Sequence, residues 1–229
     1  MTEPTRTADR PVRQWNGLTI PDPGTYELDP AHKRIGFVAQ HMMVSPVRGE
    51  FAHAVATIFV GEDPLHSSVT AVIATDSLTT HHDDRDTHLR SADFLDVEQY
   101  PTIEFRSTEV AWRGEQDAIL KWARLRNHNA DRRRVSPDTI ERADLNRMKF
   151  DVRGDLRVKG VTREVTLRMD FGGARRDPFG QDIFGFHATT DIDREEFGLV
   201  WNVALEAGGW LVGKKVRIEI AGEAVHQGR

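Results

Sequence analysis

Strict alternation of apolar and polar residues constrains this chain more than any other feature of its sequence. Every second residue from Ile35 to His41 shares one face of an extended strand, because successive strand side chains point to opposite sides. The stretch from Val216 to Ala224 repeats the pattern, and charged residues such as Arg168 and Asp170 fill alternate positions elsewhere. The sequence therefore predicts half-buried strands. A closed sheet of such strands has an apolar inner surface that can hold an apolar molecule.

The order of these segments predicts an all-β domain. Candidate strands follow one another with few helical patterns between them, at residues 24–28, near 35, and at 47–60, 69–77, 102–110, 150–159, 165–171, 183–193 and 216–224. Glycines inside strands suit a sheet that bends sharply to close into a barrel. The alternative is a flat sandwich in which these glycines mark bulges. The glycines are Gly36, Gly49, Gly154, Gly185 and Gly222.

Composition limits the protein classes open to the chain. With 229 residues and no cysteine, one large domain must be stabilised by buried apolar surface and not by disulfides. A formal net charge of -5 offers no basic surface for nucleic acid. Residues 1–22 contain no apolar stretch that could form a signal-peptide core. We therefore expect a flexible N-terminal extension over residues 1–22 and a cytoplasmic location.

Two segments depart from the strand pattern. Residues 79–101 read as a polar loop that leads into short helical turns near 86–99, with Leu89, Ala92 and Leu95 at helical intervals and Pro101 as the end. Residues 113–149 read as a charged insertion between neighbouring strands. Within it, Arg132–Arg134 is most simply a solvated face, and transient contact with an anionic membrane is a second interpretation.

Histidine and aspartate gather between His81 and His88. Imidazole and carboxylate groups are the usual ligands of zinc, so a metal-dependent enzyme is one alternative function. A solvated loop is another interpretation, and a third is that Arg85, Asp86 and His88 form local hydrogen bonds that hold the helical turn against the barrel. No cysteine or nucleophile-elbow motif supports covalent catalysis, so we expect no catalytic residue.

A set of short motifs occurs in order across nearly all of residues 23–225. The motifs lie at 26–32, 35–41, 47–51, 85–94, 100–105, 154–162 and 194–199. Together they resemble the YceI family of lipocalin-like proteins. The resemblance implies one domain over residues 23–227 that forms an extended eight-stranded antiparallel barrel. It also implies a long apolar tunnel that accommodates a polyisoprenoid or similar amphiphile, with no chemistry performed on it and no other cofactor.

The barrel interpretation predicts the residues that meet the ligand. An eight-stranded barrel is either filled by its own side chains or wide enough for one small ligand. A filled barrel would be a packed scaffold that acts through protein partners. The apolar stretch from Phe197 to Lys214 is expected to close one end of the barrel as a gate; a plain connection or a homodimer contact is the alternative. The expected ligand is a polyprenyl chain or an isoprenoid quinone, held by Phe37, His41, Phe51, Phe105, Phe171, Phe184, Phe186, Phe197 and Trp201.

Overall fold

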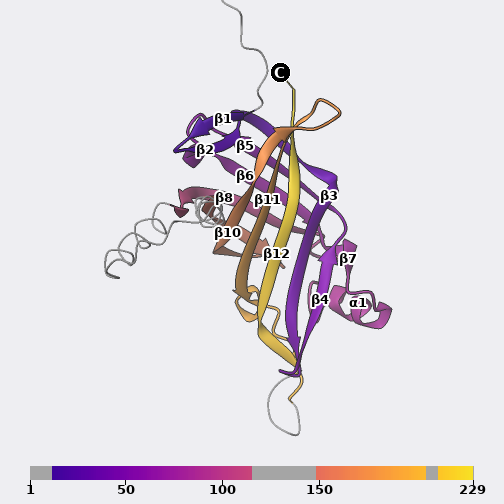
Figure 1. Cartoon of the computed structure of the whole chain (residues 1–229). Helices are drawn as coiled ribbons and strands as arrows, with labels where there is room; N and C mark the ends of the chain where they lie inside the picture. The colour runs from indigo at the N-terminus through magenta and orange to yellow at the C-terminus, as the bar shows by residue number, and fades with distance from the viewer. Residues whose placement is uncertain (1–11, 115–147, 205–210, 229) are drawn as a thin grey trace, which may run out of the picture.

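Eight antiparallel strands close into a barrel in the computed structural model, which describes residues 12–114, 148–204 and 211–228 (Figure 1). The pairing of the last strand with the first closes the ring, so the predicted eight-stranded architecture is confirmed. Around the ring the strands are β3 (Gly24–His41), β5 (Ala54–Val60), β6 (Ser68–Ala74), β8 (Thr102–Trp112), β9 (Lys149–Val158), β10 (Val161–Arg176), β11 (Asp182–Asp193) and β12 (Val212–His226).

The long strand β3 contacts two successive partners on one side. Its first part pairs with β5, and its second part pairs with β4 (Ser45–Phe51), which in turn pairs with β7 (Leu78–Thr79). On the other side of β3, Lys33 pairs with Gly222 and Leu28 pairs with Ala224. Residues 29–32 of β3 therefore bulge out opposite the single residue Glu223, at the point where β3 changes partner.

Burial alternates along the strands as the sequence pattern predicts. In β9, Phe150, Val152, Leu156 and Val158 are buried, whereas Arg153, Asp155 and Arg157 are exposed. Such alternation places one apolar face inside the barrel and one polar face in water. The apolar faces of all eight strands together form the interior surface.

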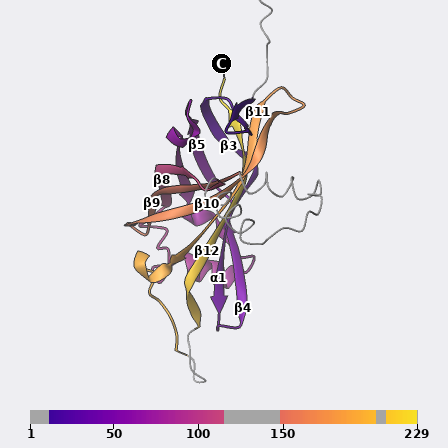
Figure 2. The same cartoon turned by 60° about the vertical axis from the view of Figure 1, so that its left-hand side comes forward.

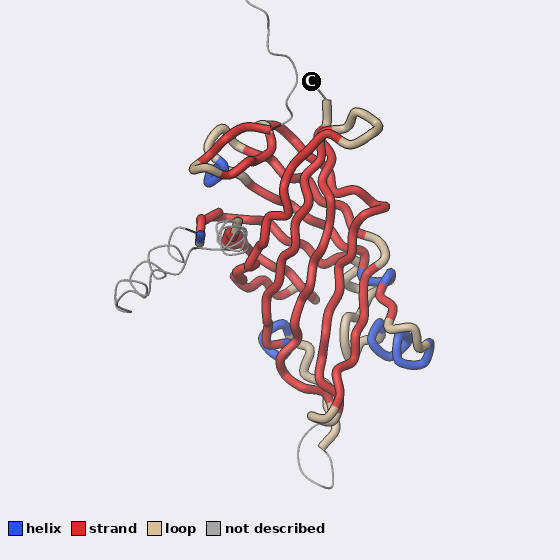
Figure 3. Tube along the Cα trace, in the orientation of Figure 1, coloured by secondary structure: helices blue, strands red, loops and turns tan. Residues whose placement is uncertain are grey.

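The short helices lie at the margins of the barrel (Figure 3). Helix α1 (Asp83–Arg90) begins earlier than the segment 86–99 in which we expected helical turns, because the His82 side chain accepts a hydrogen bond from the Arg85 amide and aspartates fill the first turn. It ends at Ser91. Two views place α1 and β4 at the end of the barrel away from the C-terminus (Figures 1 and 2). The 3₁₀ helices are η1 (Pro64–His66), η2 (Thr75–Ser77) and η3 (Arg194–Phe197).

The N-terminal segment corrects one expectation. We expected residues 1–22 to be flexible, but residues 12–21 form a hairpin of β1 (Val12–Trp15) and β2 (Leu18–Pro21) against the barrel end. Leu18 and Ile20 are each only 2% exposed, and Trp15 packs edge-on against Trp112 at a ring distance of 5.0 Å. Burial of this apolar face explains why the segment is ordered. Residues 1–11 lie outside the described part of the chain.

The predicted insertion joins two neighbouring strand ends. The Arg113 amide donates a hydrogen bond of 2.9 Å to the Lys149 carbonyl, so the chain leaves β8 and returns to β9 at the same place. Residues 115–147, with Arg132–Arg134 among them, lie outside the described residues. In the described part of the chain, no helix combines the length and the apolar character needed to cross a membrane.

Candidate functional site

The barrel interior contains a cavity of about 330 Å³. All eight strands of the ring contribute to its lining, which is what the alternation of buried residues requires. Within the described residues, the polar side chains in the lining are Ser67, Ser68, Thr190 and Arg194, and the others are apolar. The volume falls at the lower end of the range for small-molecule cavities. The side chains therefore do not fill the interior.

Six of the predicted ligand-binding residues line this cavity. They come from β3, β4, β8, β10 and β11, which places aromatic rings on several sides of the lumen. Some pack against one another, with ring centroids 5.9 Å apart for Phe37 and Phe51 and 6.1 Å apart for Phe184 and Phe186. The six are Phe37, Phe51, Phe105, Phe171, Phe184 and Phe186.

The other three predicted residues do not line the cavity. His41 lies exposed at the end of β3, beyond the part of the strand that faces the lumen. Phe197 is buried in the protein core and is 1% exposed. The Trp201 ring packs against His88 and Phe94, at centroid distances of 4.5 and 5.2 Å. Alternation predicts which face a residue occupies, but it does not predict where along a strand the lumen ends.

The Arg194 side chain links the segment that follows η3 to the start of β12 through hydrogen bonds. This side chain is 2% exposed, and its Nε donates to the Gly213 carbonyl at 3.0 Å. Its Nη1 donates to the Leu199 carbonyl and, at 3.0 Å, to the Trp201 carbonyl. Burial lowers the pKa of the Arg194 guanidinium, which nonetheless stays protonated because free arginine titrates so high. The segment 198–201 is therefore held at one end of the cavity, where Leu199 joins the lining.

The β1–β2 hairpin also contributes residues to the cavity lining. Ile20 and Pro21 both face the cavity. Arg13 fixes the hairpin by donating hydrogen bonds to the Pro21 carbonyl at 3.2 Å and to the Gly61 carbonyl at 2.5 Å. We did not predict these lining residues. The signal that could have found them is the pair Asn16–Gly17, which favours a two-residue hairpin turn and has positive φ angles of 48° and 75° here.

The side chains between His81 and His88 do not converge on one point. Burial acts to raise the pKa of the Asp86 carboxyl, but hydrogen bonds from Thr80 and Thr79 outweigh it and hold that pKa below its usual value. The Arg85 Nε donates to the Thr80 hydroxyl at 2.6 Å. The His88 Nε2 lies 3.0 Å from an Asp93 carboxylate oxygen. These are the local hydrogen bonds that the third interpretation of this segment predicts. The bonds to Thr79 and Thr80 attach α1 to the barrel, and the His88–Asp93 contact joins the end of α1 to the turn that follows it.

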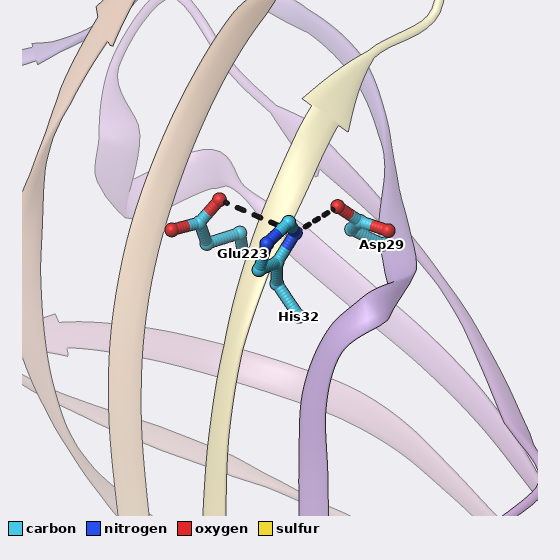
Figure 4. Close-up of side chains that lie close together, drawn as sticks. All are labelled: Asp29, His32 and Glu223. Atoms are coloured by element: carbon cyan, nitrogen blue, oxygen red, sulfur yellow. Dashed lines mark hydrogen bonds and ion pairs between the residues drawn. The ribbon is translucent and has the colours of Figure 1, made fainter. Parts of the chain in front are cut away.

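A different cluster lies on the outer surface at the bulge of β3 (Figure 4). The His32 Nδ1 is 2.7 Å from an Asp29 carboxylate oxygen and 3.9 Å from a Glu223 carboxylate oxygen. Among the described residues, this is the group of histidine and carboxylate side chains whose potential metal-ligand atoms lie within 4.8 Å of one another. Asp29 also accepts a hydrogen bond from the Ala31 amide at 2.8 Å, so it closes the bulge. The direct His32–Asp29 contact accounts for the arrangement.

The charges of this cluster predict a pH dependence. The hydrogen bond from Asp29 raises the pKa of His32 above 6.5, and the same bond lowers the pKa of Asp29 below 3.8. The stabilisation of the fold by the protonated His32 is complete below pH 6.5 and is lost as the pH rises through the folded-state pKa of His32. The stabilisation by the ionised Asp29 is lost as the pH falls through the folded-state pKa of Asp29. We expect NMR titration of the His32 ring to give a pKa above 6.5 and Asp29→Asn to lower it. An unchanged titration in Asp29→Asn would contradict the pairing.

Solved structures share this barrel. The structure of Burkholderia cenocepacia BcnA matches with a TM-score of 0.60 and 17% identity, covering 86% of this chain and 98% of that one. A polyisoprenoid binding domain from Saccharophagus degradans matches with a TM-score of 0.58 and 11% identity, covering 90% of this chain and 100% of that one. At these identities, the likeness establishes a common fold.

Sequence comparison identifies the family. A UPF0312 protein of Staphylococcus epidermidis is 32% identical over 200 residues, which span 86% of this chain and 95% of that protein. A UPF0312 protein of Staphylococcus aureus is 30% identical over the same length and coverage. The family model described as YceI-like domain matches residues 26–224, which is most of the chain and nearly the whole barrel. The resemblance seen in the motifs is confirmed, and the chain belongs to the YceI-like domain family.

Proposed function

We propose that this protein binds an isoprenoid-type amphiphilic lipid, such as a polyprenyl chain or an isoprenoid quinone, and carries or sequesters it. The observation that supports this most directly is the cavity of about 330 Å³ with its apolar lining. Each methylene group that leaves water contributes about 0.8 kcal/mol, so an enclosed chain of about ten carbons gains several kcal/mol before the loss of ligand freedom is subtracted. The shared fold with a polyisoprenoid binding domain supports the same ligand class.

The chemistry of the lining favours binding without catalysis. Among the described residues, the lining contains no histidine and no carboxylate, the side chains that most often transfer protons in enzymes. Its polar groups are hydroxyls and one guanidinium. Affinity in such a site depends mainly on how much hydrocarbon is enclosed. We therefore expect loose selection among apolar tails of similar length.

The test is native mass spectrometry of freshly purified protein, followed by organic extraction and identification of the released compounds. We expect a bound species whose mass matches an isoprenoid lipid at about one molecule per chain. Protein that is free of lipid should regain this mass shift when it is incubated with farnesol. Failure to retain or to take up any isoprenoid compound, in protein shown to be folded by circular dichroism, would refute the proposed function.

A further inference from the structure

Arg194 stands apart from the rest of the cavity lining. Among the described residues that line the cavity, it is the charged one, and it is 2% exposed. A buried charge is costly unless it is paired with an opposite charge and fully hydrogen-bonded. The surroundings of its guanidinium group therefore show whether the protein alone satisfies it.

The Nη2 atom of the guanidinium group makes only a weak hydrogen bond. Nε and Nη1 hold carbonyl oxygens at short distances, but Nη2 lies 3.4 Å from the Val212 carbonyl oxygen. That oxygen already accepts a 2.8 Å hydrogen bond from the Asn202 side chain. A normal N–H···O distance is close to 2.9 Å, so the contact of Nη2 with Val212 is a poor one.

The guanidinium charge also has no close carboxylate of its own in the described part of the chain. The nearest carboxylate contact is Glu195, at 4.0 Å from Nη2. The Glu195 carboxylate lies 2.7 Å from the Lys214 ammonium group, which raises the pKa of Lys214. The Glu195 carboxylate is therefore shared with Lys214. The charges of Glu195 and Asp193 both act on Arg194, but among the described residues Nη2 has no hydrogen-bond acceptor closer than 3.4 Å.

We propose that Arg194 recognises an anionic oxygen head group, a phosphate or a carboxylate, on the lipid bound in the cavity. This inference rests on the proposed function and adds the head-group class and the orientation of the ligand. The head would lie at the η3 end, where Nη2 donates a charge-assisted hydrogen bond. Thr190 precedes Arg194 on the strand that leads into η3 and also lines the cavity, and its hydroxyl makes no hydrogen bond within the described residues. The tail would extend toward the β1–β2 hairpin.

The wild-type protein provides the first test. Binding is measured by calorimetry at pH 8 for two pairs of probes with matched tails: farnesyl phosphate against farnesol, and palmitate against hexadecanol. We expect at least one anionic probe to bind about tenfold more tightly or better than its neutral partner; the pair that shows the preference tells phosphate from carboxylate recognition. Equal affinities within both pairs would overturn the inference and leave the proposed function intact. No binding of any probe would instead refute the proposed function.

Variants then assign the preference to one residue. In Arg194→Gln the ratio of the affinities for the anionic and the neutral probe should fall to about one, whatever the change in affinity for the neutral probe itself. Arg194→Lys keeps the positive charge and should keep part of the preference, even if the loss of the carbonyl contacts lowers its melting temperature. Arg217→Gln is the matched control, because Arg217 lies on the outer face and pairs with Asp191 at 3.1 Å. A preference that persists in Arg194→Gln would overturn the assignment.

Discussion

Replacing Ala188 by tryptophan is expected to weaken the binding of farnesol on the order of a hundredfold. Ala188 is 4% exposed, lines the cavity, and lies in register with Met169 and Ile220, which also line it. An indole ring at this position would occupy space that the ligand needs. Excluding about four methylene groups costs about 3 kcal/mol of binding free energy, which corresponds to the expected loss of affinity.

The neighbouring residue supplies the control for this experiment. Thr189 lies on the same strand, but it points to the other face of the sheet and pairs with Arg168 and Glu219. Thr189→Trp should therefore bind farnesol as the wild type does. Thermal melting of both variants separates a blocked cavity from an unfolded barrel. Wild-type affinity in a folded Ala188→Trp variant would show that the ligand does not occupy the barrel interior.

Alternation was sufficient to predict the inner faces of the barrel strands. In β9 the buried positions from Phe150 to Val158 follow the period of two, and in β11 the inward positions Phe184, Phe186 and Ala188 all reach the cavity. Such agreement is expected because a slip of one residue would move every apolar side chain to the solvent face. Which face of a strand turns toward the interior can therefore be predicted from sequence alone.

The ends of the barrel could not be predicted in the same way. The strands of the N-terminal hairpin have four residues each, which is too short for alternation to be recognised, and Asn16–Gly17 is a signal that depends on the strands around it. Alternation places His41 on the strand face that lines the lumen, but His41 lies beyond the end of the lumen. Whether the aromatic side chains fill the interior or surround a cavity depends on packing in three dimensions, and the pattern contains no information on that volume.

The role of Arg194 was also beyond the pattern. The motif at residues 194–199 suggested the family. Nothing in the sequence shows, however, that the hydrogen-bond acceptors of Arg194 are the carbonyl groups of Leu199, Trp201 and Gly213. These acceptors are backbone atoms, which every residue carries. Sequence reasoning finds side chains that pair with side chains more readily than side chains that pair with the main chain.

Gly154→Ala is expected to destabilise the barrel by about 3 kcal/mol, which would lower the melting temperature by roughly 10 °C. Gly154 lies on β9 opposite Ser107, where the register between β8 and β9 shifts before Glu109. A Cβ atom at Gly154 would lie 2.4 Å from the Arg106 carbonyl oxygen and 2.7 Å from the Ser107 Cα. These are main-chain atoms of the paired strand, so relief of the clash requires the two strands to separate.

Gly185 offers a matched substitution within the same barrel. It is also a glycine inside a strand, on β11, but a Cβ atom added there would meet no other atom within 4 Å. Gly185→Ala should therefore leave the melting temperature within a few degrees of the wild type, and it restricts the unfolded chain slightly. Chemical denaturation of the two variants measures the difference in unfolding free energy. Equal stability of the two would show that the strands at Gly154 are not held together as closely as the predicted bend of the barrel requires.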